Sequence, residues 1–197
     1  MIRFCYATDL DTHPHLRDAM LRDRAVQFQD RLGWDVAVDR QGRERDEYDD
    51  INPLYVIATD STQSQHLGSM RLLPTTGQTM VNDHFTNLMG GGTIQSPLIW
   101  ESTRFCLAPK APRSVAAHLM LAGGKILNAF ELESFVGVFD LTMLRVYRAL
   151  GASPDVLGRS NEIGVGLWTF TPGAQARLAR RANIDPAAVD ASFSQDL

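Results

Sequence analysis

The sequence predicts an α/β fold built on one mixed sheet with helices on both faces. Short apolar runs bounded by turn residues, typical of strands, alternate with longer segments whose apolar residues recur at helical spacing. The 197 residues contain no internal repeat and no linker-like stretch, so we expect a single domain over 1–197. Apolar residues make up 44% of the chain, which is enough to build a substantial core.

The N-terminal elements are a strand over 1–7 and a helix over 15–31 that ends at Gly33. The apolar stripe of this helix is formed by Leu16, Met20, Leu21 and Phe28. Residues 39–50 then crowd charged side chains into one segment. Taken alone, such a charge run is most simply interpreted as a solvated loop.

Strands dominate the middle of the chain. Residues 54–59 and 67–73 flank a polar turn and predict a hairpin. A short helix is expected over 82–88. Residues 98–107 form a long strand, and its apolar ends indicate a central, buried position in the sheet.

Helices and strands alternate in the second half of the chain. We expect a helix over 114–132, a strand over 135–139, a helix over 141–150 that ends at Gly151, strands near 154–158 and 163–170, and a helix that opens at Pro172. Residues 182–197 are expected to form a short helix and a frayed, loosely held C-terminal tail.

The composition excludes several classes of function. Lys and Arg number 19 and Asp and Glu 23, and the resulting charge of −4 argues against a general nucleic-acid binder. Cys5 and Cys106 stand alone, and two buried free thiols fit a reducing compartment. We recognise no signal peptide and no membrane-spanning run, and therefore expect a cytoplasmic protein.

Familiar catalytic motifs do not occur in the sequence. It has no nucleophile elbow, no zinc-protease motif and no dinucleotide-binding loop. Of the five histidines, only His13 and His15 lie close together, and they lack the further ligands that a metal needs. We therefore expect no metal.

Charged residues inside apolar strands are the strongest chemical signal. Arg71 lies within one such strand, and Glu101 and Arg104 lie within another. An unpaired charge is very costly to take out of water, so these residues must pair or face a cleft. A regular strand would place Glu101 and Arg104 on opposite faces, unless a bulge turns both to one cleft. The cost of burial alone does not decide whether these residues form a structural ion pair or a catalytic site.

These charges belong to a wider pattern within residues 1–107. The pattern consists of Arg24, Phe28, Trp34, Glu44, Asp46, Asp49, Arg71, Phe85, Glu101 and Arg104. In order and spacing it resembles the acyl-homoserine lactone synthases of the LuxI type. The second half of the chain matches that family only in its order of helices and strands.

The resemblance implies a fold similar to the acyltransferases of the GNAT type. It also implies transfer of an acyl chain from acyl carrier protein to the amine of S-adenosylmethionine, followed by lactone closure and release of 5′-methylthioadenosine. Phosphopantetheine arrives on the acyl donor, so no cofactor is expected. Some members of the family use acyl-CoA, and that donor stays open.

The resemblance also assigns roles to residues. Glu101 is the expected base, because an α-amine has a pKa of about 7.7–8 and must lose a proton before it attacks. The expected catalytic residues are Glu101, Arg104, Asp46, Asp49, Arg24, Arg71 and Glu44. S-adenosylmethionine is expected to bind at Arg24, Phe28, Trp34, Asp46, Arg104 and Phe105. Arg71 is expected to hold Asp46 or Asp49 in place.

The acyl chain and its carrier are assigned to the second half of the chain and to basic residues. We expect an acyl pocket formed by Leu121, Gly137, Val138, Phe139 and Met143. Members that favour 3-oxo chains often carry threonine where this chain has Gly137, so an unsubstituted or 3-hydroxy chain is expected. Glycine also leaves room for a long chain. The expected carrier-docking residues are Lys110, Arg113, Arg145 and Arg148. A second basic group comprises Arg177, Arg180 and Arg181.

Two other functions stay open. A GNAT-like N-acyltransferase that uses acyl-CoA on another amine would explain the sheet and Glu101, but not the charged residues nearer the N-terminus. A non-catalytic sensor of an adenosyl or acyl ligand would need the pocket but not Glu101.

Overall fold

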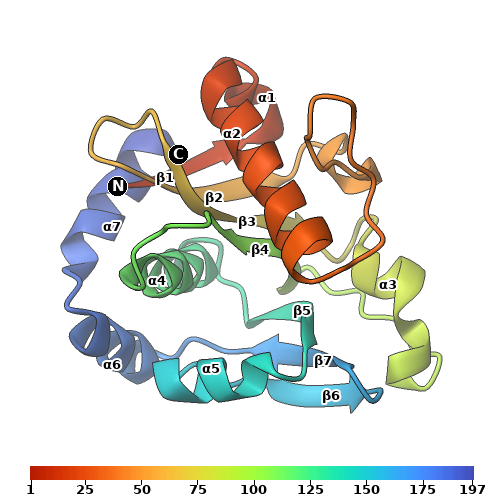
Figure 1. Cartoon of the computed structure of the whole chain (residues 1–197). Helices are drawn as coiled ribbons and strands as arrows, with labels where there is room; N and C mark the ends of the chain where they lie inside the picture. The colour runs from red at the N-terminus through yellow and green to blue at the C-terminus, as the bar shows by residue number, and fades with distance from the viewer. The chain divides into compact units, whose positions relative to one another are not determined.

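The computed structural model describes residues 1–180 and 183–197 of the chain (Figure 1). Over these residues, seven strands form one mixed sheet in the order β1-β2-β3-β4-β5-β7-β6. The strands are β1 (Ile2–Tyr6), β2 (Leu54–Thr59), β3 (His66–Pro74), β4 (Ile99–Leu107), β5 (Ser134–Asp140), β6 (Asp155–Arg159) and β7 (Ile163–Trp168). The expected α/β class is confirmed, and β4 takes the central place expected for 98–107.

Helices occupy most of the connections between strands. They are α1 (Ala7–Leu10), α2 (Pro14–Ala25), α3 (Met80–His84), α4 (Ser114–Ala129), α5 (Met143–Leu150), α6 (Pro172–Ala182) and α7 (Pro186–Asp196). The helix expected over 15–31 is α2 together with a π-helical continuation, Val26–Arg31. No described helix combines the length and the hydropathy needed to cross a membrane.

The chain divides into two compact units, each assembled from stretches far apart in the sequence. Unit 1 comprises Met1–Arg71, Arg104–Ala122 and Ala187–Leu197, and unit 2 comprises Leu72–Thr103 and Gly123–Pro186. Strands β3 and β4 contribute residues to both units. The expectation of a single domain over 1–197 stays a prediction.

In unit 1, helix α2 packs on strands β1 and β2, which run antiparallel with Ile2 opposite Ala58 (Figure 1). The shared core consists of Cys5, Leu10, Leu16, Met20, Leu21, Tyr55 and Ile57. Burial of one large apolar side chain contributes about 1.5–3 kcal/mol, so packing of the stripe holds the helix more than intrinsic propensity does. The core also fixes the direction in which the end of α2 points its polar residues.

The C-terminal segment contains the short helix expected within 182–197, but the end of this helix is held in place and is not a frayed tail. Residue 182 lies outside the described residues. Helix α7 packs on β1, where Phe193 meets Phe4 edge to face at 5.3 Å between ring centroids. The Asp196 carboxylate accepts a hydrogen bond of 2.9 Å from the backbone N–H of Phe4. Strand β1 is an edge strand, and α7 satisfies an N–H group that no neighbouring strand covers.

In unit 2, strands β5 and β7 carry different side chains on their two faces. They are antiparallel, and residues directly opposite each other share a face. The valine face carries Val136, Val138 and Val165 and packs on Val81 of α3. The aromatic face carries Phe139 and Trp168, which contact Tyr147 of α5.

Parallel pairing between β4 and β5 is short. It joins Ile99–Glu101 to Ser134–Val136, although both strands continue beyond these residues. Glu101 is in register with Val136 and therefore lies on the valine face. Gly137 is the next residue of β5, so its Cα faces the aromatic side.

The two cysteines are buried free thiols, as expected, and burial raises the pKa of each to about 12. A thiol must ionise to react, so neither Cys5 nor Cys106 is expected to be alkylated by iodoacetamide in the folded protein. Intact mass measured over time will show this, and the same protein in denaturant should take up two labels. Rapid labelling without denaturant would contradict the prediction.

Candidate active site

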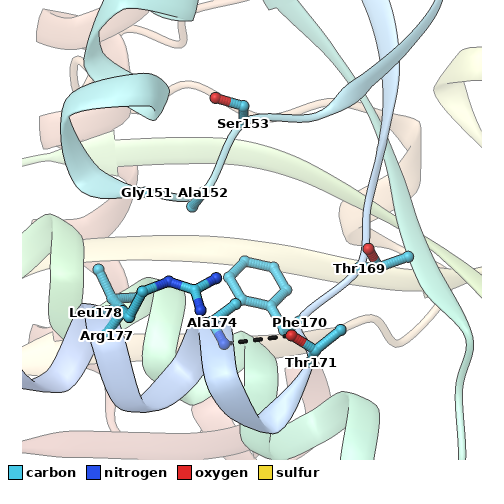
Figure 2. Close-up of a pocket in the computed structure, with 9 residues that line it drawn as sticks. All are labelled: Gly151, Ala152, Ser153, Thr169, Phe170, Thr171, Ala174, Arg177 and Leu178. Carbon is cyan, nitrogen blue, oxygen red and sulfur yellow. Dashed lines mark hydrogen bonds between the residues drawn. The ribbon is translucent and has the colours of Figure 1, made fainter.

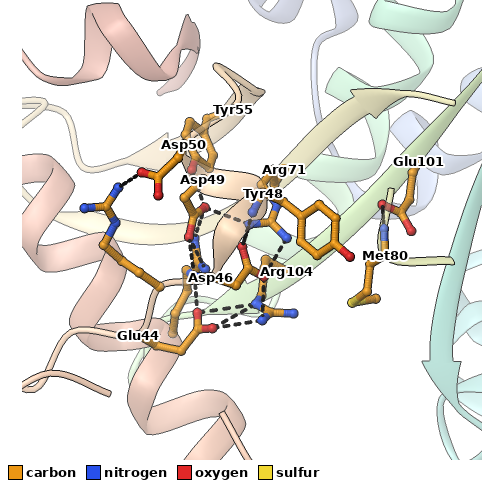
Figure 3. A network of polar contacts seen from close by, with 12 residues as sticks. Glu44, Asp46, Tyr48, Asp49, Asp50, Tyr55, Arg71, Met80, Glu101 and Arg104 are labelled. Carbon is orange, nitrogen blue, oxygen red and sulfur yellow. Dashed lines mark hydrogen bonds and ion pairs between the residues drawn. The ribbon is translucent and has the colours of Figure 1, made fainter. Parts of the chain in front are cut away.

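Six charged side chains of unit 1 form one network, part of which is seen in Figure 3. Its members are Arg24 from α2, Glu44, Asp46 and Asp49 from the charged segment, Arg71 from β3 and Arg104 from β4. The interpretation of 39–50 as a solvated loop is wrong for Glu44 and Asp49, which are 0% and 6% exposed. These carboxylates are buried because arginines from three other elements pair with them.

Arg24 binds two carboxylates inside the core. Its Nε donates to Glu44 Oε2 at 2.5 Å. Its Nη1 and Nη2 donate to the two oxygens of Asp49, each at 2.9 Å. This fork-shaped pairing engages all three nitrogens of the planar guanidinium, which lysine could not reproduce.

Arg71 holds both Asp46 and Asp49, whereas the sequence led us to expect one or the other. Its Nη1 donates to Asp49 at 2.8 Å and also to Asp46, and its Nη2 donates to Asp46 at 2.9 Å. The guanidinium also lies 5.4 Å from the ring centre of Tyr48. The attraction between a cation and an aromatic face adds to this fixation.

The charged segment folds so that it presents these carboxylates. Asp46 accepts a hydrogen bond from the N–H of Tyr48, and Asp49 accepts one from the N–H of Asp46, at 3.1 and 3.0 Å. This reciprocal cap begins a short 3-10 helix, Glu47–Asp49. Local capping therefore fixes the spacing of the two aspartates before Arg71 binds them.

Arg104 connects the network to an aromatic wall. Its Nη2 donates to Glu44 at 2.9 Å and lies 2.7 Å from Asp46. Its guanidinium lies 5.4 Å from the centre of the Phe28 ring, which stacks on Trp34 at 5.2 Å. Arg104 has φ +51°, a left-handed conformation that is uncommon in a strand and breaks the regular alternation of β4.

The arginines control the ionisation of the buried aspartate. Burial alone would raise the pKa of Asp49, but Arg24, Arg71 and the Tyr55 hydroxyl lower it well below its ordinary value. Burial would likewise lower the pKa of Arg24, but Asp49 and Glu44 raise it above the ordinary value. Charge therefore persists in the core because each charged group has partners.

The low pKa of Asp49 predicts acid sensitivity. A carboxylate whose pKa is depressed by folding stabilises the native state above its unfolded pKa, which is 3.8 here, and loses this contribution as the pH falls. The denaturant midpoint is expected to stay level between about pH 5 and 7 and to fall below about pH 4. Urea unfolding at each pH measures this. Asp49→Asn should flatten the slope below pH 4, and an unchanged slope would contradict the assignment.

Glu101 lies in unit 2 and is fully buried. Its Oε2 accepts a hydrogen bond from the N–H of Met80 at 3.0 Å, and its Oε1 accepts one from the N–H of Val81 at 2.6 Å. These two donors begin α3 and stabilise a negative carboxylate. The expected base is thus also a clamp for the start of α3. Along β4 it precedes Arg104 by three residues, and Arg104 itself has the left-handed backbone conformation.

The residues expected to line the acyl pocket do not share one surface. Gly137 and Phe139 belong to the aromatic face, and Val138 belongs to the valine face because alternate strand residues point opposite ways. Leu121 is buried on α4 in unit 1, and Met143 is half-buried on α5 in unit 2.

The remaining expected residues lie near the surface or in the core. Phe105 is half-buried beside Arg104, and Phe85 packs against the valine face. The expected docking residues Lys110, Arg113, Arg145 and Arg148 are all exposed. Arg181 of the second basic group lies outside the described residues.

Sequence reasoning missed Tyr55. Its hydroxyl donates to Asp49 at 2.5 Å from a strand that otherwise carries apolar side chains. A tyrosine in a fully buried strand needs a polar partner, and this signal was available in the sequence. The backbone donors of Met80 and Val81 leave no signal in residue types, because every non-proline residue carries an N–H.

Comparison with known proteins decides the family. The model of the autoinducer synthase family matches residues 8–166. The acyl-homoserine-lactone synthase of Rhizobium etli is 41% identical over 182 residues, which cover 87% of this chain and 85% of that protein. The chain belongs to the autoinducer synthase family. The synthase is therefore an acyltransferase that makes an acyl-homoserine lactone.

Solved structures agree on the fold of the synthase. It matches BjaI, described as a CoA-dependent acyl-homoserine lactone synthase with SAM and isopentyl-CoA, with a TM-score of 0.84 and 20% identity, over 97% of this chain and 99% of that one. An acyl-CoA N-acyltransferase from Pseudomonas aeruginosa matches with a TM-score of 0.54 and 14% identity, over 86% and 98%. The expected GNAT-like fold is confirmed.

Proposed function

We propose that the synthase uses S-adenosylmethionine as acceptor and an acyl thioester on acyl carrier protein as donor. The amine nitrogen attacks the thioester carbonyl, an amide bond forms, and the carrier thiol leaves. The carboxylate oxygen of the acylated product then attacks the γ-carbon. The bond between that carbon and the sulfonium breaks, which closes the lactone and releases 5′-methylthioadenosine.

The observation that carries the acceptor assignment is the graded exposure of the charged network. Arg24, Glu44, Asp49 and Arg71 have side chains only 0–3% exposed, whereas Arg104 and Asp46 are 9% and 12% exposed. The four inner groups neutralise one another and fix the outer two. Arg104 and Asp46 thus offer one positive and one negative group to a ligand that carries a carboxylate, an ammonium and a sulfonium.

The aromatic pair beside Arg104 suits the rest of that ligand. Phe28 is buried beneath the guanidinium, and Trp34 is stacked on it but only half-buried. A half-buried ring can stack on adenine or attract a sulfonium by a cation–π contact. We assign the adenosyl group to the Trp34 side of the network.

Asp46→Asn is expected to raise the KM for S-adenosylmethionine about 10–100-fold, the size of one hydrogen bond to a charged group. The reason is that asparagine cannot neutralise the cationic part of the substrate. Asp50→Asn is the matched control, because Asp50 is four residues on and its side chain is 72% exposed beside Arg45. Steady-state kinetics with varied S-adenosylmethionine compare the two variants. Equal effects would contradict the assignment.

Acyl carrier protein is acidic, so the donor assignment rests on exposed basic residues. Lys110 and Arg113 precede the N-terminus of the sixteen-residue helix α4. The positive end of a helix dipole together with two cations favours a phosphate group. This arrangement would suit the phosphate of phosphopantetheine and would also attract the carrier surface.

The assignment of the acyl group's 3-position rests on Gly137, which we take as the residue past which the acyl chain runs. A Cβ at this residue would lie 2.9 Å from the Ser102 carbonyl oxygen and 3.2 Å from Trp168 Cζ3. Threonine would not fit unless β4 or the indole moved. We therefore propose an unsubstituted or 3-hydroxy acyl chain. The room expected beside this glycine is occupied by Trp168.

One reconstitution tests the proposal. Purified synthase is incubated with S-adenosylmethionine and either octanoyl-acyl carrier protein or octanoyl-CoA, with 3-hydroxy and 3-oxo forms of each. Mass spectrometry should detect the lactone and 5′-methylthioadenosine in equal amounts, with the carrier-bound donors fastest and 3-oxo chains slowest. Faster turnover with CoA would overturn the donor assignment. No lactone from any donor would overturn the reaction.

A further inference from the structure

Glycines and aromatic rings alternate across the aromatic face of unit 2. In the register of β5 and β7, Gly137 lies opposite Gly166, and Phe139 lies opposite Gly164. A Cβ at Gly164 or Gly166 would lie 2.9 or 3.1 Å from the Phe139 ring. The rings therefore lie flat on the backbone where the glycines have no side chain. The Trp168 ring lies on the backbone of Gly137 in the same way.

The Trp168 indole is fixed at both ends. Its six-membered ring lies against Gly137, with Cζ3 and Cη2 at 3.2 and 3.8 Å from the place of a Cβ. Its Nε1 donates to the Ala152 carbonyl at 3.0 Å. Edge-to-face contacts with Phe139 and Tyr147, at 5.5 and 5.3 Å between centroids, hold the ring sideways. The indole is therefore a rigid wall.

A cavity of about 400 Å³ has Ala152 in its lining (Figure 2). Ala152 accepts the indole hydrogen bond and also lines the cavity, as does Thr169, the next residue after Trp168. Phe170 and Leu178 are apolar residues of the cavity lining, and Arg177 adds a charged side chain to that lining. The indole thus stands between Gly137 and the cavity wall.

The proposed path of the acyl chain leads toward this indole. Glu101 lies on the valine face and Gly137 lies on the aromatic face, so a chain that reacts near Glu101 and passes Gly137 must cross the sheet. Regular pairing of β4 with β5 ends at Glu101 and Val136, and the next residue of β5, Gly137, lies against the Ser102 carbonyl of β4, so the crossing requires the two strands to part between Ser102 and Gly137. A chain that crosses there meets the ring that covers Gly137.

We propose that Trp168 sets the upper limit on acyl-chain length by separating the acyl position at Gly137 from the cavity beside Ala152. The proposal rests on the proposed function, in which the acyl chain passes Gly137. The synthase accordingly selects short chains whose methyl end abuts the indole. Removal of the ring joins the acyl position to a cavity with an apolar side, which accepts further methylenes.

The test is the chain-length preference of Trp168→Leu. Relative kcat/KM is measured with butanoyl, octanoyl and dodecanoyl thioesters on both acyl carrier protein and CoA. The dodecanoyl-to-octanoyl ratio should rise at least about tenfold over the wild type, because one methylene in an apolar pocket is commonly worth about 10–200-fold. Trp168→Phe keeps an aromatic ring of smaller size and should shift the ratio in the same direction by less.

The matched control is Phe193→Leu in unit 1. This substitution removes the edge-to-face contact between Phe193 of α7 and Phe4 of β1. The ring centroids of that pair are 5.3 Å apart and the ring planes meet at 83°, which matches the 5.3 Å and 81° of Trp168 with Tyr147. Its chain-length ratio should equal that of the wild type. Thermal unfolding of each variant identifies any that fails to fold, in which case Trp168→Phe decides.

Calorimetric binding of dodecanoyl-CoA and butanoyl-CoA separates this inference from the proposed function. If the wild type forms no lactone from any donor, the proposed function fails. The inference is then judged by the ratio of the affinities for dodecanoyl-CoA and butanoyl-CoA, which should be higher in Trp168→Leu than in the wild type. Unchanged ratios in both Trp168 variants, in turnover and in binding, would overturn the inference.

Discussion

Exchange of Glu101 for glutamine is expected to lower kcat by about 10²–10⁴-fold at neutral pH. A carboxylate can take the proton from the ammonium group of the acceptor, directly or through a water, whereas a neutral amide cannot. The deficit should shrink above about pH 8, because the amine then loses its proton to solvent and needs no base. Initial rates of lactone formation across the pH range measure both effects.

The clamp on α3 must be separated from the proton transfer. Glutamine has one acceptor oxygen, so one of the N–H groups of Met80 and Val81 would lose its partner, at a cost of about 1–3 kcal/mol in the free energy of unfolding. Met80→Pro removes one of these donors but keeps the carboxylate. Met80 is the first residue of α3, where proline is tolerated, and Thr79 before it is already extended.

This proline variant should therefore be destabilised to a similar degree and yet keep most of its turnover. Its rate should also show the same pH dependence as the wild type. If Met80→Pro loses as much activity as Glu101→Gln, and both deficits are independent of pH, then Glu101 acts only as a structural clamp and the base lies elsewhere.

Replacement of Arg24 by methionine is expected to reduce the free energy of unfolding by about 3–5 kcal/mol. Arg24 is 1% exposed and pairs with Glu44 and Asp49, which are themselves buried. Methionine fills a similar volume but leaves two carboxylates in the core with fewer partners. Urea unfolding followed by circular dichroism measures the change.

Arg22→Met is the matched control for this loss. It lies two residues earlier on α2 and pairs with Asp18 at 2.8 Å, but its side chain is 54% exposed. An exposed pair within one helix contributes at most about 0.5 kcal/mol, so stability should change little. Comparable losses in the two variants would show that burial of the network adds nothing to its stability.

Elements with a clear local pattern could be predicted from the sequence, and those that depend on distant partners could not. The helix over 15–31 has its apolar stripe within its own sequence, and 98–107 is apolar at both ends. Helix α7 has a weak pattern of its own, and its position depends on Phe4 at the other end of the chain. The sequence therefore predicted a short helix in this segment but not the contacts that hold its end.

The same distinction applies to the candidate site. The residue types near Asp46 and Asp49 indicated solvent, because a charge run is usually solvated. Their burial depends on arginines from α2 and β3 that no local pattern connects to them. The family resemblance supplied that connection. It could not supply Trp168, since the contact of an indole with a glycine on another strand is a property of packing.

The contact between α7 and β1 also bears on how the protein is made. The bond from Phe4 to Asp196 joins residues separated by 192 positions. A ribosome therefore exposes β1 long before its covering helix exists, and during that time the strand edge is open to pairing with other chains. Expression conditions that slow elongation lengthen this interval. Aggregation of nascent chains should accordingly begin at the first strand, and chaperones that shield extended segments are expected to raise the yield.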